Sequence, residues 1–194
     1  MFRFLLGLIF GVLLVLLAAF GWLSFGHVPV AVADPPLPQE RLITGVPLHS
    51  RIDHEMVKTP PIQPSEANFI AGARIYTEQC AACHGYYDKP SSFGKDMFPD
   101  APHLWEKHPD DNVVGVSDDP PGETYWKVAN GIRLSGMPSY KKTLAETEMW
   151  QVSLLLANAD KPLPPEAMYL LRGNSPVPPV TPAPAAPAAP QPAH

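Results

Sequence analysis

Hydrophobic and polar positions are spread very unevenly along the chain, and the longest apolar run comes first. The 22 residues from Phe4 to Phe25 are all apolar or glycine apart from one serine, and no charged residue occurs between Arg3 and Asp34. At about 1.5 Å per residue, a helix of this length spans about 33 Å, enough to cross a hydrocarbon core of roughly 30 Å. Residues 1–33 are therefore predicted to be an N-terminal membrane anchor or an uncleaved signal.

The residues on either side of this apolar run bear on whether it is cleaved and on its orientation in the membrane. The Ala-Val-Ala sequence at residues 31–33 has the small-x-small pattern of a signal cleavage site, so removal of the segment is the alternative to a retained anchor. Arg3 is the only charged residue before the run, which favours an amino end in the cytoplasm and the rest of the chain outside. Both alternatives direct the chain to an export pathway.

Three later segments carry the three- and four-residue spacing of amphipathic helices. They are predicted to run from about 66 to 79, from about 122 to 129, and from just after Thr143 to about 159. Ser65 is the expected N-cap of the first, and Thr143 with Glu146 forms an expected capping box for the third. The predicted inward positions are Phe69, Gly72, Ala73, Tyr76, Cys80, Tyr125, Val128, Ala129, Met149, Trp150, Leu154 and Leu155.

No run of alternating apolar and polar residues predicts a strand, so the fold class is expected to be all-α. The segment between residues 85 and 120 shows no regular pattern. A loop of this length in a small domain is unusual unless it has a function, and we expect it to wrap around a bound group.

Proline separates the predicted parts of the chain. Residues 34–65 hold seven prolines, which predicts an extended linker, and residues 174–194 hold eight prolines and six alanines, which predicts a disordered tail. The expected organisation is an anchor (1–33), a Pro-rich linker (34–65), a folded helical domain (66–173) and the tail (174–194).

Composition narrows the function classes. The 194 residues carry a formal net charge of −5, so no basic surplus points to nucleic acid. The chain has two cysteines, Cys80 and Cys83, with only two residues between them, which excludes a disulfide framework.

These two cysteines belong to the sequence Cys80-Ala-Ala-Cys83-His84. At the end of a helix, the spacing places both thiols and the imidazole on one face. Cys-x-x-Cys-His is the pattern of c-type haem attachment, in which both sulfurs bond to the porphyrin vinyl groups and the histidine binds iron. The sequence therefore predicts one covalently attached haem c, with His84 as an iron ligand.

The two cysteines have two alternative uses. A thioredoxin-type redox pair would need a βαβ context, which the pattern does not show. A zinc site could combine Cys80 and Cys83 with His103 and His108, although this set leaves His84 without a role.

The second axial ligand is predicted to be Met137, which lies between a glycine and a proline. Glycine allows close approach of the backbone to the ring, and a thioether ligand favours ferrous iron. Met97, His103 and His108 remain the alternatives.

At this point the sequence resembles class I cytochrome c domains, over roughly residues 68–159. The resemblance rests on the glycine, tyrosine and Cys-x-x-Cys-His-Gly pattern of residues 72–85, on residues 125–132 (Tyr-Trp-Lys-Val-Ala-Asn-Gly-Ile), on Gly-Met-Pro at 136–138 and on Trp150. It implies that the first and last helices of the domain cross near Gly72, with Tyr76 and Trp150 packing there. It also implies a proline carbonyl that accepts a hydrogen bond from His84 Nδ1, with Pro102 as the expected residue and Pro99 as the alternative.

The expected function follows from this set of residues. With His84 and Met137 both bound, no iron position is open to substrate, so the protein is expected to be an electron carrier and not an enzyme. We expect a single-pass protein of the bacterial cytoplasmic membrane, with the haem domain on the periplasmic or outer side and membrane-bound or periplasmic redox proteins as partners. The alternatives are a cytochrome subunit of a membrane oxidoreductase complex, and a haem protein with a displaceable methionine that acts on small gases or peroxide.

Overall fold

The computed structural model describes residues 1–174, so the predicted disorder of 175–194 lies outside the described residues. Its elements are α1 (Phe2–Phe25), α2 (Glu40–Glu55), α3 (Glu66–Gln79), α4 (Ala81–His84), the 3₁₀ helix η1 (Gly94–Asp96), α5 (Pro121–Asn130), α6 (Glu146–Leu156) and α7 (Pro165–Leu171). The described residues form no strand and only two isolated β-bridges. The predicted all-α fold class is confirmed.

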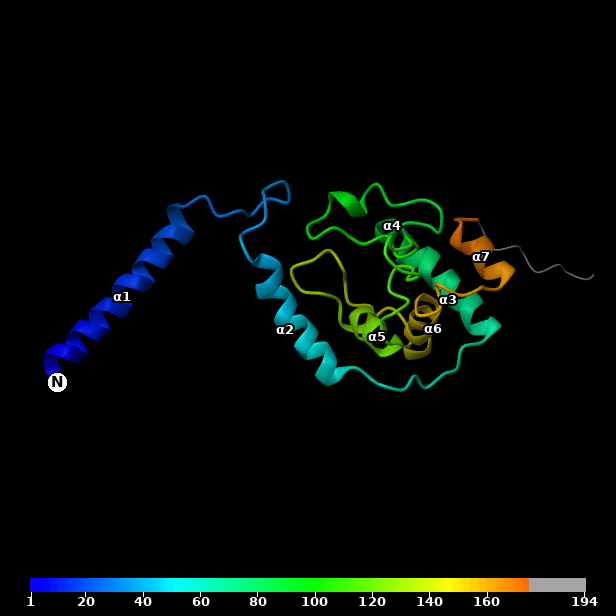
Figure 1. The fold of residues 1–194 in the computed structure, drawn as a ribbon, viewed down its shortest axis with the longest axis horizontal. Coiled ribbons are helices and arrows are strands. Elements are labelled where there is room, and N and C mark those ends of the chain that lie inside the picture. Colours follow the sequence, from blue (N-terminus) through cyan, green and yellow to red (C-terminus); the bar gives the residue numbers. More distant parts are fainter. Residues whose placement is uncertain (175–194) are drawn as a thin grey trace, which may run out of the picture.

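Helix α1 matches the predicted anchor in position and character. Its 24 residues bury no side chain, and it is the one helix within residues 1–174 that is long and apolar enough to cross a membrane. Figure 1 shows it standing apart from the remaining helices. These features fit a membrane anchor.

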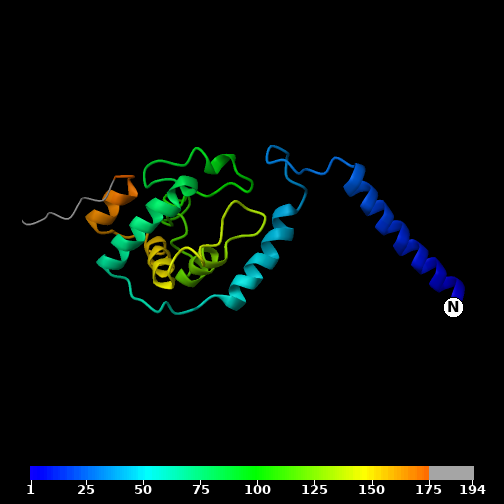
Figure 2. The same cartoon turned by 180° about the vertical axis from the view of Figure 1, so that it is seen from behind.

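The core is built where α3 crosses α6, with α5 and α7 packed on either side (Figures 1 and 2). The crossing is tight at Gly72, because a Cβ atom built there would lie 2.5 Å from the carbonyl oxygen of Gln151 in α6. This close approach is what the family resemblance implies. Tyr76 and Trp150 are both buried, as the resemblance implies, and each has its own ring partner: Tyr76 packs edge-on against Trp105, and Trp150 stacks on Tyr125 with 4.1 Å between ring centroids.

We predict that Gly72→Ala destabilises the protein, because the added methyl group meets backbone that cannot move without separating α3 from α6. Overpacking of this kind costs about 1–3 kcal/mol. Gly45→Ala is the matched control, since the nearest atoms to a Cβ in α2 are 3.8 Å away, and we expect it to be neutral or to stabilise by about 0.5–1 kcal/mol. Thermal unfolding of the two variants measures the difference, and equal midpoints would contradict the tight crossing.

The bounds of α3 agree with the prediction, and Ser65 caps the helix by accepting a hydrogen bond from the backbone N–H of Asn68. The prediction that Thr143 caps α6 is wrong. The helix begins at Glu146, and the side chain of Glu148 accepts a hydrogen bond from the backbone N–H of Ala145. The Thr143 hydroxyl instead donates to the carbonyl of Tyr140, so it closes the turn that precedes the helix.

The expectation of extended backbone throughout 34–65 is also wrong, because residues 40–55 form α2. This helix contains Pro47 and packs on α5. Ile52 is 1% exposed, and the Trp126 indole N–H donates to Glu55 at 2.9 Å. These tertiary contacts stabilise a helix that local sequence does not favour.

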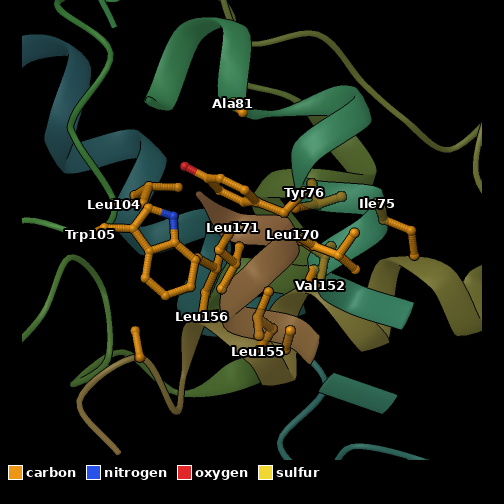
Figure 3. Close-up of a cluster of buried hydrophobic side chains, with 14 of the residues drawn as sticks. Ile75, Tyr76, Ala81, Leu104, Trp105, Val152, Leu155, Leu156, Leu170 and Leu171 are labelled. Atoms are coloured by element: carbon orange, nitrogen blue, oxygen red, sulfur yellow. The ribbon is translucent and has the colours of Figure 1, made fainter. Parts of the chain in front are cut away.

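The sequence pattern does not predict α7 (Pro165–Leu171), because seven residues are too few to show helical periodicity. It buries Ala167, Leu170 and Leu171 against α3. Figure 3 shows Leu170 and Leu171 beside Tyr76, with Leu104 and Trp105 of the long 85–120 loop completing the cluster.

Candidate functional site

The Cys-x-x-Cys-His sequence forms a tight turn at the carboxyl end of α3. Cys80 caps α3, and its carbonyl oxygen accepts hydrogen bonds from the backbone N–H groups of Cys83 (3.1 Å) and His84 (2.9 Å). Both cysteines are free thiols and are half-buried. The turn thus presents two unbonded sulfur atoms and one imidazole from five consecutive residues.

The imidazole of His84 is held at one nitrogen. Its Nδ1 lies 2.8 Å from the carbonyl oxygen of Pro102, a geometry in which Nδ1–H donates and Nε2 keeps its lone pair. Pro102, and not the alternative Pro99, makes this contact. Burial lowers the pKa of His84, the hydrogen bond to Pro102 opposes the shift, and nearby His103 adds to it. A neutral imidazole with a free Nε2 is the form that binds a metal.

The loop after the motif wraps around the cysteine-bearing turn. The hydroxyl of Ser91 donates to the carbonyl of Ala82 at 2.6 Å, and the buried Tyr76 hydroxyl donates to the carbonyl of Gly85 at 2.8 Å. Gly94 of η1 lies so close to the turn that a Cβ atom there would be 2.0 Å from the Cys83 carbonyl oxygen. This packing fixes the backbone that carries both cysteines and the histidine.

Met137 lies on a compact loop that folds back on the end of α5. Its carbonyl oxygen accepts a hydrogen bond from the Ile132 N–H at 3.2 Å, and its N–H donates to the Ser135 hydroxyl at 3.2 Å. Gly131 adopts a positive φ of 68°, and a Cβ atom there would lie 2.8 Å from the Met137 carbonyl oxygen, so only glycine allows this fold-back without strain. The Met137 side chain is half-buried against the core.

Tyr140 joins this loop to the cysteine-bearing turn. Its hydroxyl donates to the carbonyl of Gln79 at 2.8 Å, directly before Cys80, and its own N–H donates to the carbonyl of Val128. Burial raises the pKa of the Tyr140 phenol, and the two cysteines add to the shift. Burial likewise raises the pKa of the Cys80 thiol to about 12, with a further contribution from Cys83.

Of the three alternative iron ligands, one methionine lies near Met137, one histidine is hydrogen-bonded elsewhere and the other histidine is exposed. Met97 lies against Gly136, where a built Cβ atom would be 1.7 Å from the Met97 methyl carbon, so a second methionine sits one residue from Met137. His103 is engaged elsewhere, because its Nε2 hydrogen-bonds to the Tyr86 carbonyl at 2.8 Å. His108 is exposed on the long loop.

The zinc alternative lacks the geometry it needs. Within residues 1–174, no three His, Cys, Asp or Glu side chains come close enough to hold a metal ion between them. Cys80 and Cys83 therefore do not join His103 and His108 in a four-ligand site.

The donor chemistry of this site fits haem c. Two free thiols lie three residues apart on one helical turn, and the adjacent histidine has one nitrogen oriented by a carbonyl and the other free. A soft thioether is held on the loop that Tyr140 brings to this turn. No contact in the described part of the site contradicts attachment.

Comparison with known proteins gives one family. Residues 67–154 match the family described as cytochrome C oxidase, cbb3-type, subunit III. No curated protein matches the chain. A solved structure, the reducing HAO-like protein complex of Kuenenia stuttgartiensis, is 21% identical with a TM-score of 0.37, and the match covers 51% of this chain and 46% of that one.

The matched range begins in the first turn of α3 and ends inside α6, so it spans the cysteine-bearing turn, the wrapping loop and the Met137 loop. Such a domain implies haem c and a role in electron transport. Residues 67–154 of this chain are therefore a c-type cytochrome domain.

Proposed function

We propose that this protein is a membrane-tethered monohaem cytochrome c that carries single electrons between redox partners on the outer side of a bacterial cytoplasmic membrane. In this proposal one haem is bonded to Cys80 and Cys83, and its iron is held between His84 and Met137. The observation that carries it is the 2.8 Å contact between His84 Nδ1 and Pro102, which leaves Nε2 free beside two unbonded thiols.

The residues of the site have separate roles in this function. Bound haem supplies an iron that alternates between the ferrous and ferric states. Pro102 orients His84, while Gly131 and Tyr140 fix the Met137 loop against the cysteine-bearing turn. With His84 and Met137 both holding the iron, no position would be open to a substrate, so the chain would act as a carrier.

A second candidate is a dedicated subunit of a membrane oxidoreductase complex. The description of the matched family, an oxidase subunit, favours it. Copurification of the chain in a stable complex after detergent extraction would distinguish this role from that of a free carrier.

The proposed function is tested on full-length protein expressed with haem-attachment machinery. We expect a band that stays haem-stained after denaturation, a methionine–iron charge-transfer absorption in the oxidised protein, and flotation with membranes. Protease added to spheroplasts should remove the haem domain while the membrane stays sealed. Colourless protein, or a haem domain that only lysed cells expose, would contradict the proposal.

Basic residues lie around Met137 on a chain whose net charge is −5. Arg133, Lys141 and Lys142, which bracket Met137 in the sequence and are called the basic rim here, are all exposed, and Leu134, next to Arg133 in the chain, is 82% exposed. An exposed apolar side chain bordered by positive charge suits transient docking of an acidic redox partner, in which surface charge acts mainly on the association rate.

We predict that the Lys141→Glu, Lys142→Glu double variant slows electron transfer to an acidic partner at low salt and flattens the dependence of the rate on ionic strength. Stopped-flow oxidation over a salt series measures this. Lys58→Glu, Lys161→Glu makes the same change in net charge at exposed positions outside the basic rim and serves as the control. If the electron-transfer rates of the two double variants depend equally on ionic strength, Lys141 and Lys142 do not dock the partner.

A further inference from the structure

Helix α2 belongs to the folded body, although it lies in the segment that joins α1 to the cytochrome domain. Its inward face is fixed by the Trp126–Glu55 hydrogen bond of 2.9 Å, by the Arg51 guanidinium 5.9 Å from the Trp126 ring centroid, and by burial of Ile52. Just beyond the helix, the carbonyl of Val57 packs on Gly122, where a Cβ atom would be only 2.0 Å away. Because α2 is fixed to the cytochrome domain, a contact made by the outward face of α2 also sets the orientation of the domain.

That outward face changes character along the helix. Its first two turns present Leu42, Ile43 and Val46, which are 61%, 68% and 59% exposed. One to two turns later, the same side carries the exposed polar residues Ser50 and Asp53. The exposed apolar side chains are thus confined to the end of α2 that is nearer to α1 along the chain.

The connection between the two helices continues this apolar surface. Val30 and Val32 are 90% and 58% exposed, and the first charged residue after Arg3 is Asp34. The 14 residues between α1 and α2 can extend no further than about 43 Å in a polyproline conformation, at about 3.1 Å per residue. The start of α2 is therefore confined to the neighbourhood of the membrane that α1 is proposed to span.

We propose that Leu42, Ile43 and Val46 form a lipid-contact surface, which inserts into the headgroup boundary of the bilayer and holds the cytochrome domain in one orientation on the membrane. The inference rests on the proposed function, because it needs α1 to be a membrane anchor. Three neighbouring aliphatic side chains with polar residues beyond them resemble the apolar edge of an interfacial helix. They are too few for a stable protein interface, which takes about 800 Å² from each partner.

A fixed orientation has a functional consequence. Docking of α2 on α5 leaves only the short connection before it as a tether, so the domain samples a smaller volume than the whole 34–65 segment would allow if extended. Lipid contact at the first turns of α2 would further hold α5, and with it the Met137 loop at the end of α5, at a set height above the membrane.

The test uses full-length holoprotein in phosphatidylcholine vesicles. A fluorescent label is attached to Val46→Cys, the only free thiol once Cys80 and Cys83 are bonded to haem, and to Asp53→Cys as the matched control on the same side of α2. In vesicles made with lipids brominated on the acyl chains, we expect the label at 46 to lose most of its emission and the label at 53 to keep it. A water-soluble quencher should act in the opposite order.

The outcomes separate this inference from the proposed function. If the protein does not float with the vesicles, the anchor and the inference both fail. If it floats but the label at 46 responds only to the water-soluble quencher, the anchor stands and lipid contact is overturned. If neither quencher reaches the label at 46, the surface contacts protein instead, and the proposed lipid contact is also overturned. Leu42→Gln, Ile43→Gln added to Val46→Cys should restore water access while flotation is unchanged.

Discussion

Replacing both Cys80 and Cys83 with serine is expected to abolish covalent haem attachment completely. The hydroxyl groups keep the size of the side chains but cannot form the two thioethers, and the chain has no other cysteine. The turn itself should persist, because it is held by backbone hydrogen bonds from Cys83 and His84 to the carbonyl of residue 80. Haem staining after denaturing electrophoresis, normalised to protein, measures the loss.

Single replacements test the same proposition more finely. With one thiol left, each variant is expected to retain at most one thioether, and its reduced spectrum should shift towards longer wavelength because one vinyl group stays unsaturated. Ser91→Ala is the control, since it removes a hydrogen bond to Ala82 beside the turn but no sulfur. A double serine variant that still stains for haem would overturn the assignment of both cysteines.

Met137→Ala is expected to lower the reduction potential and to remove the methionine–iron absorption, while covalent haem is retained. A thioether is a soft, weakly basic ligand that stabilises ferrous over ferric iron, so its loss favours the oxidised state. Axial ligands shift haem potentials over roughly 0.8 V, and a change on the order of 0.1 V or more is expected here. Redox titration followed by visible absorption measures both quantities.

Met97→Leu is the matched control, because Met97 lies against Gly136, next to Met137. It removes one sulfur atom near the site at similar side-chain volume, and we expect both the potential and the absorption band to be kept. If Met97→Leu removes the band and Met137→Ala does not, Met97 is the axial ligand. The two variants therefore decide between the methionines that the fold brings together.

Much of the candidate site follows from short-range sequence. Because residues at i, i+3 and i+4 share one face of a helix, the order Cys80, Cys83, His84 places three donor groups on one turn before any tertiary contact is considered. Helix α3 begins and ends where the pattern and the Ser65 cap predict. The apolar run of α1 is equally local, since length and hydropathy alone make it able to cross a bilayer.

Other features depended on residues far apart in the sequence. The sequence favours Pro102 as the partner of His84 but leaves Pro99 open, because the choice depends on how the loop closes around the turn, and in the structure Pro102 makes the contact at 2.8 Å. The same holds for the ring pairs: Trp105, which showed no local signal, packs on Tyr76, and Tyr125 takes the stacking position on Trp150.

The sequence by itself determined the anchor-like helix, the all-α class and the spacing of the cysteines and histidine, because each depends on the geometry of a single helix. Only the tertiary structure decided that residues 40–55 form a helix despite Pro47, since its stability comes from burying Ile52 and pairing Glu55 with Trp126, 71 residues away. Proline inside a helix costs about 3 kcal/mol. Burial of one large aliphatic side chain is worth about 1.5–3 kcal/mol, so burial of Ile52 together with the Trp126–Glu55 hydrogen bond offsets the cost of Pro47.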